Sequence, residues 1–220
     1  MRARQRIAAA LTVAAIAAVT LAGCGGDGWA RPHAAPTAIG DLGTGFEPSA
    51  SPSPEATINP SPGSWDGVRP SPGYRVVLLT AGQDRPTRAL VSAVRAWADE
   101  QDVDLRTVRA DDDLVGGIVT AIGMKPDLVV SAGNDLVDPL ATVSASHLGQ
   151  RFLVVGAELA EPTHNVTAVD WSGASFRGEG LGASSGYDPD SFTAERCGAA
   201  VRAGVAAVLH DLTGIVIWIG

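Results

Sequence analysis

The side chains best suited to hold a small polar molecule stand where predicted strands end. Asp170 and Trp171 close one such strand, where a carboxylate can accept hydrogen bonds from ligand hydroxyls and an indole can stack on a ring. Asn134 and Asp135 follow another strand and offer hydrogen-bond donors and acceptors. Both pairs have a structural alternative, since surface loops use the same residue types and Asn and Asp also shape turns. The pattern indicates the rim of a site but does not identify a ligand.

A Gly-x-Ser-x-Gly pattern at residues 182–186 is the candidate for covalent chemistry, with Ser184 as its nucleophile. In serine hydrolases this pattern needs a strand before it and a helix directly after it, so that a strained turn exposes the serine. Here it lies in a polar, glycine-rich loop and does not meet that condition. A glycine spacing in the same loop also fails as a dinucleotide site, because it does not join the first strand to a helix. We therefore expect no enzyme activity and no cofactor, with a Ser184 hydrolase as the weakest alternative.

Charge and composition exclude further classes of function. The chain of 220 residues carries a formal charge of −8, and nucleic-acid binding needs a basic face, so no nucleic-acid partner is expected. The four histidines show no metal-ligand spacing, and we expect no metal site. Of the two cysteines, Cys24 belongs to the N-terminal segment described below, which leaves Cys197 without an intramolecular partner. We expect Cys197 in the core as a small hydrophobe, a reactive thiol being the alternative.

Short apolar runs alternate with helical patterns over residues 73–220, which we take as one globular domain. One helix is predicted to start at Pro86 and to bury a stripe of Leu90, Val94 and Trp97. Another is predicted to start at Asp138 as its N-cap, with Pro139 at the first helical position. Apolar runs rich in β-branched residues predict strands at residues 75–80, 104–109, 127–131, 151–155, 166–170 and 215–219.

Repeated strand–helix units predict an α/β fold, a doubly wound and mostly parallel sheet covered by helices on both faces. In such folds ligands bind at the loops that follow the carboxyl ends of the strands. These loops are predicted at residues 81–85, 132–138, 156–161 and 170–175.

Residues 25–72 show no hydrophobic periodicity, and proline and serine recur through them. Such a segment does not bury enough apolar surface to offset its conformational entropy. We therefore predict a disordered tether, in which Trp65 is incidental.

The N-terminus has the layout of an export signal. Arg2, Arg4 and Arg6 precede an apolar run, and small residues lead to Cys24, so residues 1–24 are predicted to be a signal peptide. The run is shorter than the roughly 20 apolar residues of a membrane-spanning helix. Leu21-Ala22-Gly23-Cys24 resembles the lipobox of bacterial lipoproteins, which implies acylation of Cys24 and attachment to the outer side of the cell membrane. An ordinary signal peptide or an uncleaved anchor is the alternative.

The second half resembles the first lobe of the basic membrane lipoprotein family, receptors with a type I periplasmic-binding-protein-like fold. The resemblance rests on residues 126–133 with Asp138 five residues further on, on residues 151–155, and on residues 194–206 with 213–216. It implies a substrate-binding protein of an ABC transporter whose ligand is a polar small molecule, at best estimate nucleoside-like.

The resemblance also implies roles for particular residues. Asp84 is the counterpart of an Asp-rich turn that follows the first strand in the family. Gly133 matches the glycine after the third strand, and Asn134 replaces an aromatic residue there, which removes a stacking surface. Asp138 matches a carboxylate that accepts hydrogen bonds from the ligand, its alternative being the helix cap before Pro139. These residues complete a predicted ligand set with Asp170 and Trp171.

The family crosses into a second lobe where this chain stops, at Gly220. Three expectations follow from this difference. The sequence is truncated, or it is a one-lobe relative that works with an ABC permease or a second copy, or it is an envelope interaction protein that has lost ligand binding.

Overall fold

The computed structural model describes residues 29, 31–159, 162–174 and 186–220. The predicted signal peptide with Cys24 and the serine motif around Ser184 lie outside these residues. The chain divides into two units, residues 1–31 and 32–220, and the fold described below is that of the second. Within the described residues, no helix combines the length and the apolar character that crossing a bilayer requires.

Seven parallel strands form one sheet in the order β2-β9-β8-β7-β6-β4-β5. The strands are β2 (Thr57–Ile58), β4 (Arg75–Thr80), β5 (Asp104–Arg109), β6 (Leu128–Ala132), β7 (Phe152–Val155), β8 (Val166–Asp170) and β9 (Val216–Trp218). Two short strands, β1 (Ala38–Ile39) and β3 (Arg69–Pro70), pair antiparallel outside this sheet.

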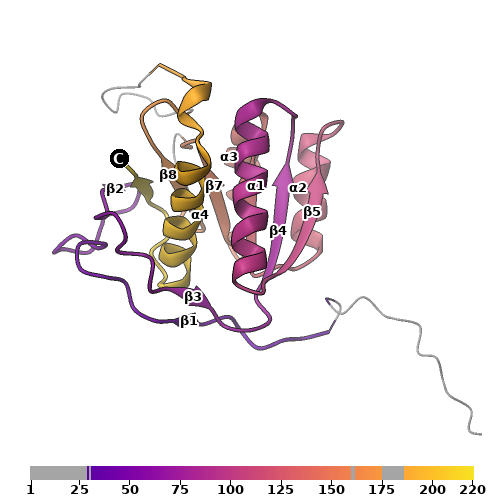
Figure 1. The fold of residues 1–220 in the computed structure, drawn as a ribbon. Helices are drawn as coiled ribbons and strands as arrows, with labels where there is room; N and C mark the ends of the chain where they lie inside the picture. Colours follow the sequence, from indigo (N-terminus) through magenta and orange to yellow (C-terminus); the bar gives the residue numbers. More distant parts are fainter. Residues whose placement is uncertain (1–28, 30, 160–161, 175–185) are drawn as a thin grey trace, which may run out of the picture. The chain divides into compact units, whose positions relative to one another are not determined.

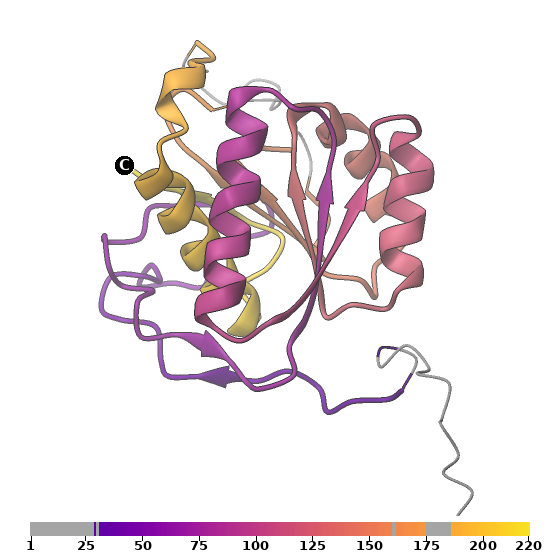
Figure 2. The same ribbon diagram turned by 45° about the vertical axis from the view of Figure 1, so that its right-hand side comes forward.

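Helices cover both faces of the sheet, which confirms the predicted α/β class. Helix α1 (Arg85–Glu100) packs beside α4 (Ala194–Leu209), and α2 (Leu114–Gly123) packs beside α3 (Val137–Ser144). Figures 1 and 2 show the first pair on one side of the sheet and the second pair on the other. The central strands are apolar on both sides because neither side meets water.

Helix α1 forms where the sequence predicts it. Asp84 is its N-cap and accepts a hydrogen bond from the Thr87 backbone N–H at 3.0 Å. The predicted apolar stripe of Leu90, Val94 and Trp97 is buried against the sheet. In α4, Cys197 is fully buried as predicted, and burial raises the pKa of its thiol to about 11.

The start of α3 differs from the prediction. A 3₁₀ turn over Asn134–Leu136 leads directly into the helix, so α3 begins at Val137 and not after Asp138. The Val137 backbone N–H bonds to the Asn134 carbonyl, so helical winding has started before the proline. Asp138 is therefore not the cap. It lies exposed in the first turn, where its negative charge still complements the helix dipole.

The predicted disordered tether is wrong for residues 32–72, which pack as part of the domain. Strand β2 extends the main sheet by pairing Thr57 with Val216 of β9. Phe46 and Trp65 are buried and meet edge to face, with ring centroids 6.4 Å apart. The few apolar residues of this segment pack into a core formed by residues more than a hundred positions away. Such contacts produce no periodic pattern in the local sequence, so the sequence did not predict them.

Replacing Phe46 with alanine tests whether this segment belongs to the core. Phe46 is 1 % exposed, and truncating a buried phenylalanine costs about 3–5 kcal/mol of unfolding free energy. We expect a loss of this size in urea denaturation. Thr44→Ala, at an exposed neighbouring position, is the matched control and should change stability little. Equal midpoints for the two variants would contradict the packing described here.

Candidate functional site

The strand order places a topological switch point between β4 and β6. From β4 the chain moves to β5 on one side, and it then crosses back to β6 on the other. The loops that follow β4 and β6 therefore run in opposite directions and leave a crevice at the carboxyl ends of the strands. Gly133 permits the close approach there, since its φ is +133° and a Cβ would lie 2.3 Å from the Ala81 carbonyl oxygen.

Three of the predicted ligand residues come together at this switch point. Asp84, Gly133 and Asn134 all line one crevice, together with Gly156 after β7 and the aromatic pair Tyr187 and Phe192. The cavity volume is about 10 Å³, close to the space that one water molecule occupies. The structure thus confirms that these three residues are neighbours, and the crevice between them is narrow.

Asp84 is held in place by Thr87 but keeps hydrogen-bonding capacity. One carboxylate oxygen accepts from the Thr87 N–H at 3.0 Å and the other from the Thr87 hydroxyl at 2.7 Å. Partial burial raises the pKa of Asp84, yet these hydrogen bonds outweigh it and lower the pKa below its ordinary value. The exposed carboxylate is charged at neutral pH, and each oxygen has a further lone pair for a ligand hydroxyl.

Tyr187 is a rim residue that the sequence analysis missed. Its ring is 51 % exposed and packs edge to face on Phe192, with centroids 6.1 Å apart. Partial burial and the negative charge of Asp84 raise the pKa of its phenol, so the hydroxyl stays protonated and can donate. An aromatic surface therefore stands at the crevice although Asn134 is not aromatic. Tyr187 follows a loop with no periodic pattern, so local sequence gave no signal for its position.

Three predicted ligand residues, Asp138, Asp170 and Trp171, do not line the crevice. Asp138 is exposed on α3 and does not line the crevice. Trp171 is 1 % exposed; its indole N–H donates to the Ser191 hydroxyl at 3.0 Å, and its ring meets Phe192 at 4.9 Å between centroids. The predicted stacking role of Trp171 is therefore wrong in this structure, because packing already occupies the ring. The Trp171 ring packs close to Gly156, which lines the crevice: a Cβ on Gly156 would lie 3.1 Å from the ring.

Asp170 and Glu158 place two buried carboxyl groups near the ends of the neighbouring strands β8 and β7. They are 1 % and 4 % exposed, and the Trp171 backbone N–H donates to Asp170 at 2.8 Å. The pKa of Asp170 is raised to about 7, mainly because the carboxyl is buried. The hydrogen bond from Trp171 lowers this pKa in part, and the charge of Glu158 raises it further. Burial also raises the pKa of Glu158. No group of three or more metal-ligating side chains gathers within the described residues.

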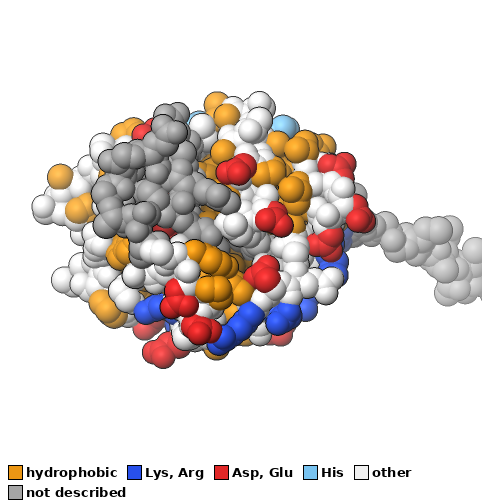
Figure 3. Space-filling view, turned by 90° about the horizontal axis from the view of Figure 1, so that it is seen from above, with side chains coloured by type: hydrophobic (Ala, Val, Ile, Leu, Met, Phe, Trp, Pro, Cys, Tyr) orange, Lys and Arg blue, Asp and Glu red, His pale blue; other side chains and the backbone are white. Residues whose placement is uncertain are grey.

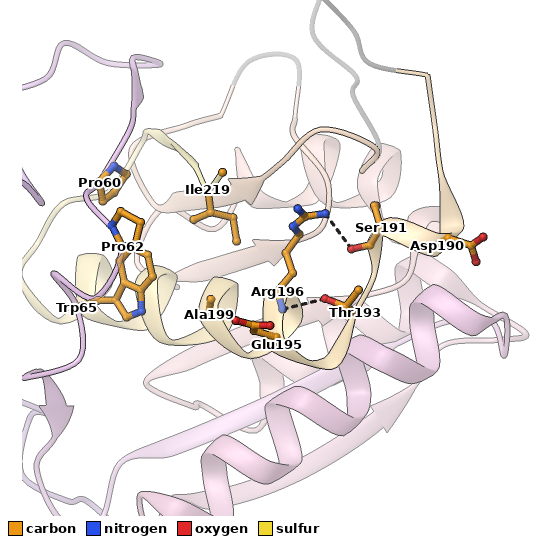
Figure 4. A pocket seen from close by; sticks show the side chains of 11 residues that line it. Pro60, Pro62, Trp65, Asp190, Ser191, Thr193, Glu195, Arg196, Ala199 and Ile219 are labelled. Carbon is orange, nitrogen blue, oxygen red and sulfur yellow. Dashed lines mark hydrogen bonds between the residues drawn. The ribbon is translucent and has the colours of Figure 1, made fainter.

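A larger cavity of about 370 Å³ lies at the same edge of the sheet, beside the end of β9 (Figure 4). Pro60, Pro62 and Trp65 form one wall, and the start of α4 with Arg196 forms the other. The Arg196 guanidinium donates to the Ser191 carbonyl at 3.3 Å, which fixes its direction. Sequence reasoning missed this cavity because one wall comes from the segment predicted to be disordered.

Comparison with known proteins shows only partial likeness. No family model matches the chain, and no curated protein matches it. A fragment of a candidate lipoprotein from Peptoclostridium difficile 630 is 16 % identical, with 63 % of this chain and 99 % of that chain covered and a TM-score of 0.44. An ABC transporter solute-binding protein from Aeropyrum pernix K1 is 19 % identical, with 45 % and 29 % covered and a TM-score of 0.39.

A third solved structure, an ABC transporter solute-binding protein from Mycobacterium smegmatis with bound glycerol, is 13 % identical. The alignment covers 67 % of this chain and 56 % of that chain, with a TM-score of 0.35. The chain thus spans less than a third of the Aeropyrum protein and just over half of the Mycobacterium protein. Likeness at this level assigns neither a ligand nor a partner to this chain, and membership of the basic membrane lipoprotein family stays a prediction.

The raised pKa of Asp170 predicts how stability depends on pH. The folded protein holds this proton up to about pH 7, whereas an unfolded aspartate releases it near pH 4. The folded state therefore binds more protons between these values, and stability falls as the pH rises through them. The difference of about three pKa units corresponds to at most about 4 kcal/mol.

We expect Asp170→Asn to remove most of the stability loss that the parent shows as the pH rises. The variant should therefore be more stable than the parent at pH 8 and gain little at pH 4. Urea denaturation at both pH values measures it, with Asp112→Asn at an exposed position as the control. A stability gain for Asp170→Asn that is the same at both pH values would contradict burial of an ionising carboxyl.

Proposed function

We propose that this chain is the solute-binding lobe of an extracytoplasmic, lipid-anchored binding protein, which holds a polar small molecule without altering it chemically. The observation that carries the proposal is the meeting of Asp84, Asn134 and the half-exposed ring of Tyr187 at the switch point of a parallel sheet. Ligands of open α/β sheets bind at that place.

The three side chains supply complementary contacts for a solute that has both a ring and hydroxyl groups. The Asp84 carboxylate accepts hydrogen bonds from hydroxyls, and the Asn134 amide both donates and accepts. The Tyr187 ring offers a flat apolar face, on which a sugar or a base can stack. Sugars, polyols and nucleosides share this chemistry, and the family resemblance favours the nucleosides among them.

In this proposal the lobe provides one side of the binding site. Sites for small molecules usually enclose about 300–1,000 Å³, whereas the crevice holds about 10 Å³. The solute therefore rests on the rim formed by Tyr187, Asp84 and Asn134, and a second surface covers it. A second lobe, a second copy of the chain or an ABC permease would supply that surface.

The narrow crevice also favours a second candidate function. A lobe whose ligand space has been filled by Phe192 and its neighbours can keep the fold and act only as an envelope interaction protein. The two functions differ in what stabilises the isolated chain, because only a binding lobe gains stability from a small solute.

A thermal-shift screen with nucleosides, sugars, polyols and amino acids separates these two functions. A ligand at 100 times its Kd adds about 2.7 kcal/mol of stability, which raises Tm by several degrees for a domain of this size. We expect a shift with at least one hydroxyl-bearing ring compound. No shift with any compound up to millimolar concentrations would favour the interaction protein.

Two variants locate the binding of any compound that shifts Tm. Tyr187→Ala removes the stacking face and should weaken binding about tenfold, which corresponds to about 1.4 kcal/mol. Asp84→Asn keeps a good N-cap for α1 but removes the charge, and it should weaken binding while Tm of the free protein changes little. Asp99→Asn at the far end of α1 is the matched control. Unchanged affinity in both rim variants would place the solute elsewhere.

The lipid anchor has its own test. Metabolic labelling with radioactive palmitate should mark the parent chain, and Cys24→Ser should abolish the label because the acylated thiol is gone. Cys197→Ser serves as the control for the other cysteine, which is buried in α4 and should keep the label intact. An unlabelled parent chain would refute the anchor and leave the solute site untouched.

A further inference from the structure

A second cavity of about 370 Å³ opens at the carboxyl edge of the sheet, between α1 and the end of β5. All three charged side chains that line it are arginines: Arg88, Arg95 and Arg109. Apart from Val91 the remaining lining is polar or glycine, and it includes Thr80 and Ser92. This cavity lies on the other side of α1 from the Tyr187 rim, and its function does not depend on the solute site proposed above.

The three guanidinium groups enter the cavity from two walls. Arg88 and Arg95 are two helical turns apart on α1, so they share one face at a spacing of roughly 10 Å along the axis. Arg109 comes from the opposite wall, at the end of β5, where it pairs in register with Thr80 of β4. The regular fold of the domain therefore holds the positive charges around one space.

Little negative charge compensates them within the described residues. Arg88 donates to the neutral Gln83 carbonyl, and its positive charge also helps to lower the pKa of the Asp84 carboxyl. Arg109 lies 3.9 Å from one oxygen of Asp111, whose other oxygen accepts from the Gly82 N–H at 2.9 Å. Arg95 has no ion pair in the part of the chain that the structure describes. Several N–H donors remain for an anion.

We infer that this cavity binds a small, multiply charged anion that bears phosphate or carboxylate groups. The planar fork of arginine matches both groups in bidentate geometry, and charge-assisted hydrogen bonds of this kind are the strong ones. Three arginines around one cavity favour an anion with two or more charges over a monoanion. The Thr80 and Ser92 hydroxyls can add neutral hydrogen bonds, and the volume fits a molecule of small-metabolite size.

The surroundings select a small anion over a polyanion. The chain carries a net charge of −8, and Asp111, Asp112 and Asp113 directly follow β5. Figure 3 shows basic side chains along one border of the carboxyl-end face, with acidic side chains beside some of them and over the rest of the face. A nucleic acid or an anionic bilayer would have to approach those acidic groups, whereas a small anion meets only the cavity.

Calorimetric titration of the full chain with inorganic phosphate, pyrophosphate, citrate and acetate tests the inference at low ionic strength. We expect pyrophosphate or citrate to bind, acetate not to bind, and binding to weaken as salt is added. Arg95→Gln should lower the affinity at least about tenfold, and Arg88→Gln with Arg109→Gln should abolish it. Arg202→Gln on α4 is the matched control, because Arg202 is a half-buried arginine that pairs with Asp66 and lies outside the cavity.

The outcomes separate the alternatives. No binding of any of the four anions by the parent chain overturns the inference, and so does an equal loss of affinity in the Arg202 control. Flotation with phosphatidylglycerol and phosphatidylcholine vesicles is the second arm, in which we expect the cavity variants to show the same vesicle preference as the parent. A phosphatidylglycerol preference that Arg95→Gln removes, without binding of soluble anions, would assign the arginines to a lipid surface instead.

Discussion

The domain depends on the burial of both faces of its parallel sheet. Val76, Val77, Leu78 and Leu79 of β4 are all fully buried, so each side of this strand needs its own layer of helices. The helices can lie on opposite faces only if the chain reverses its direction of growth across the sheet, and the reversal falls between β4 and β6. The crevice that holds Asp84 and Asn134 is therefore a consequence of how the core is covered, before any ligand is considered.

The carboxyl edge of the sheet also carries polar groups that do not stabilise the fold. Asp170 is buried with a carboxyl whose pKa is near 7, and Glu158 lies buried close to it. An apolar residue in either position would avoid the desolvation cost of a charge. Departures from good packing that persist in a well-ordered core are concentrated at functional sites. The acidic pair lies at the same edge of the sheet as the crevice, but neither residue lines it.

Sequence alone predicted the features that depend on near neighbours. The six predicted strands, the helix at Pro86 with its Leu90 stripe, and the burial of Cys197 all follow from local patterns, and the structure confirms them. Prediction from the sequence failed for features that depend on contacts between distant residues. Phe46 and Trp65 lie among prolines and serines in the sequence, and they are buried in a core cluster that includes residues of α4 and β9. The position of Trp171 after a strand predicted a rim residue. Its indole N–H instead bonds to Ser191 and its ring packs on Phe192, about twenty residues further along the chain, so the side chain lies in the core.

Helix α1 explains why one edge of the sheet carries two sites of opposite electrostatic character. Its cap Asp84 faces the crevice beside Tyr187, and Thr87 lines both the crevice and the arginine cavity. One residue further, the helix has turned by about 100°, so Arg88 and then Ser92 and Arg95 face the other side. The Asp84 carboxylate and the three arginines thus line different cavities, although the charge of Arg88 still acts on Asp84 and lowers its pKa. The 3.6-residue period of α1 is what places the proposed solute rim and the proposed anion site on different sides of the helix.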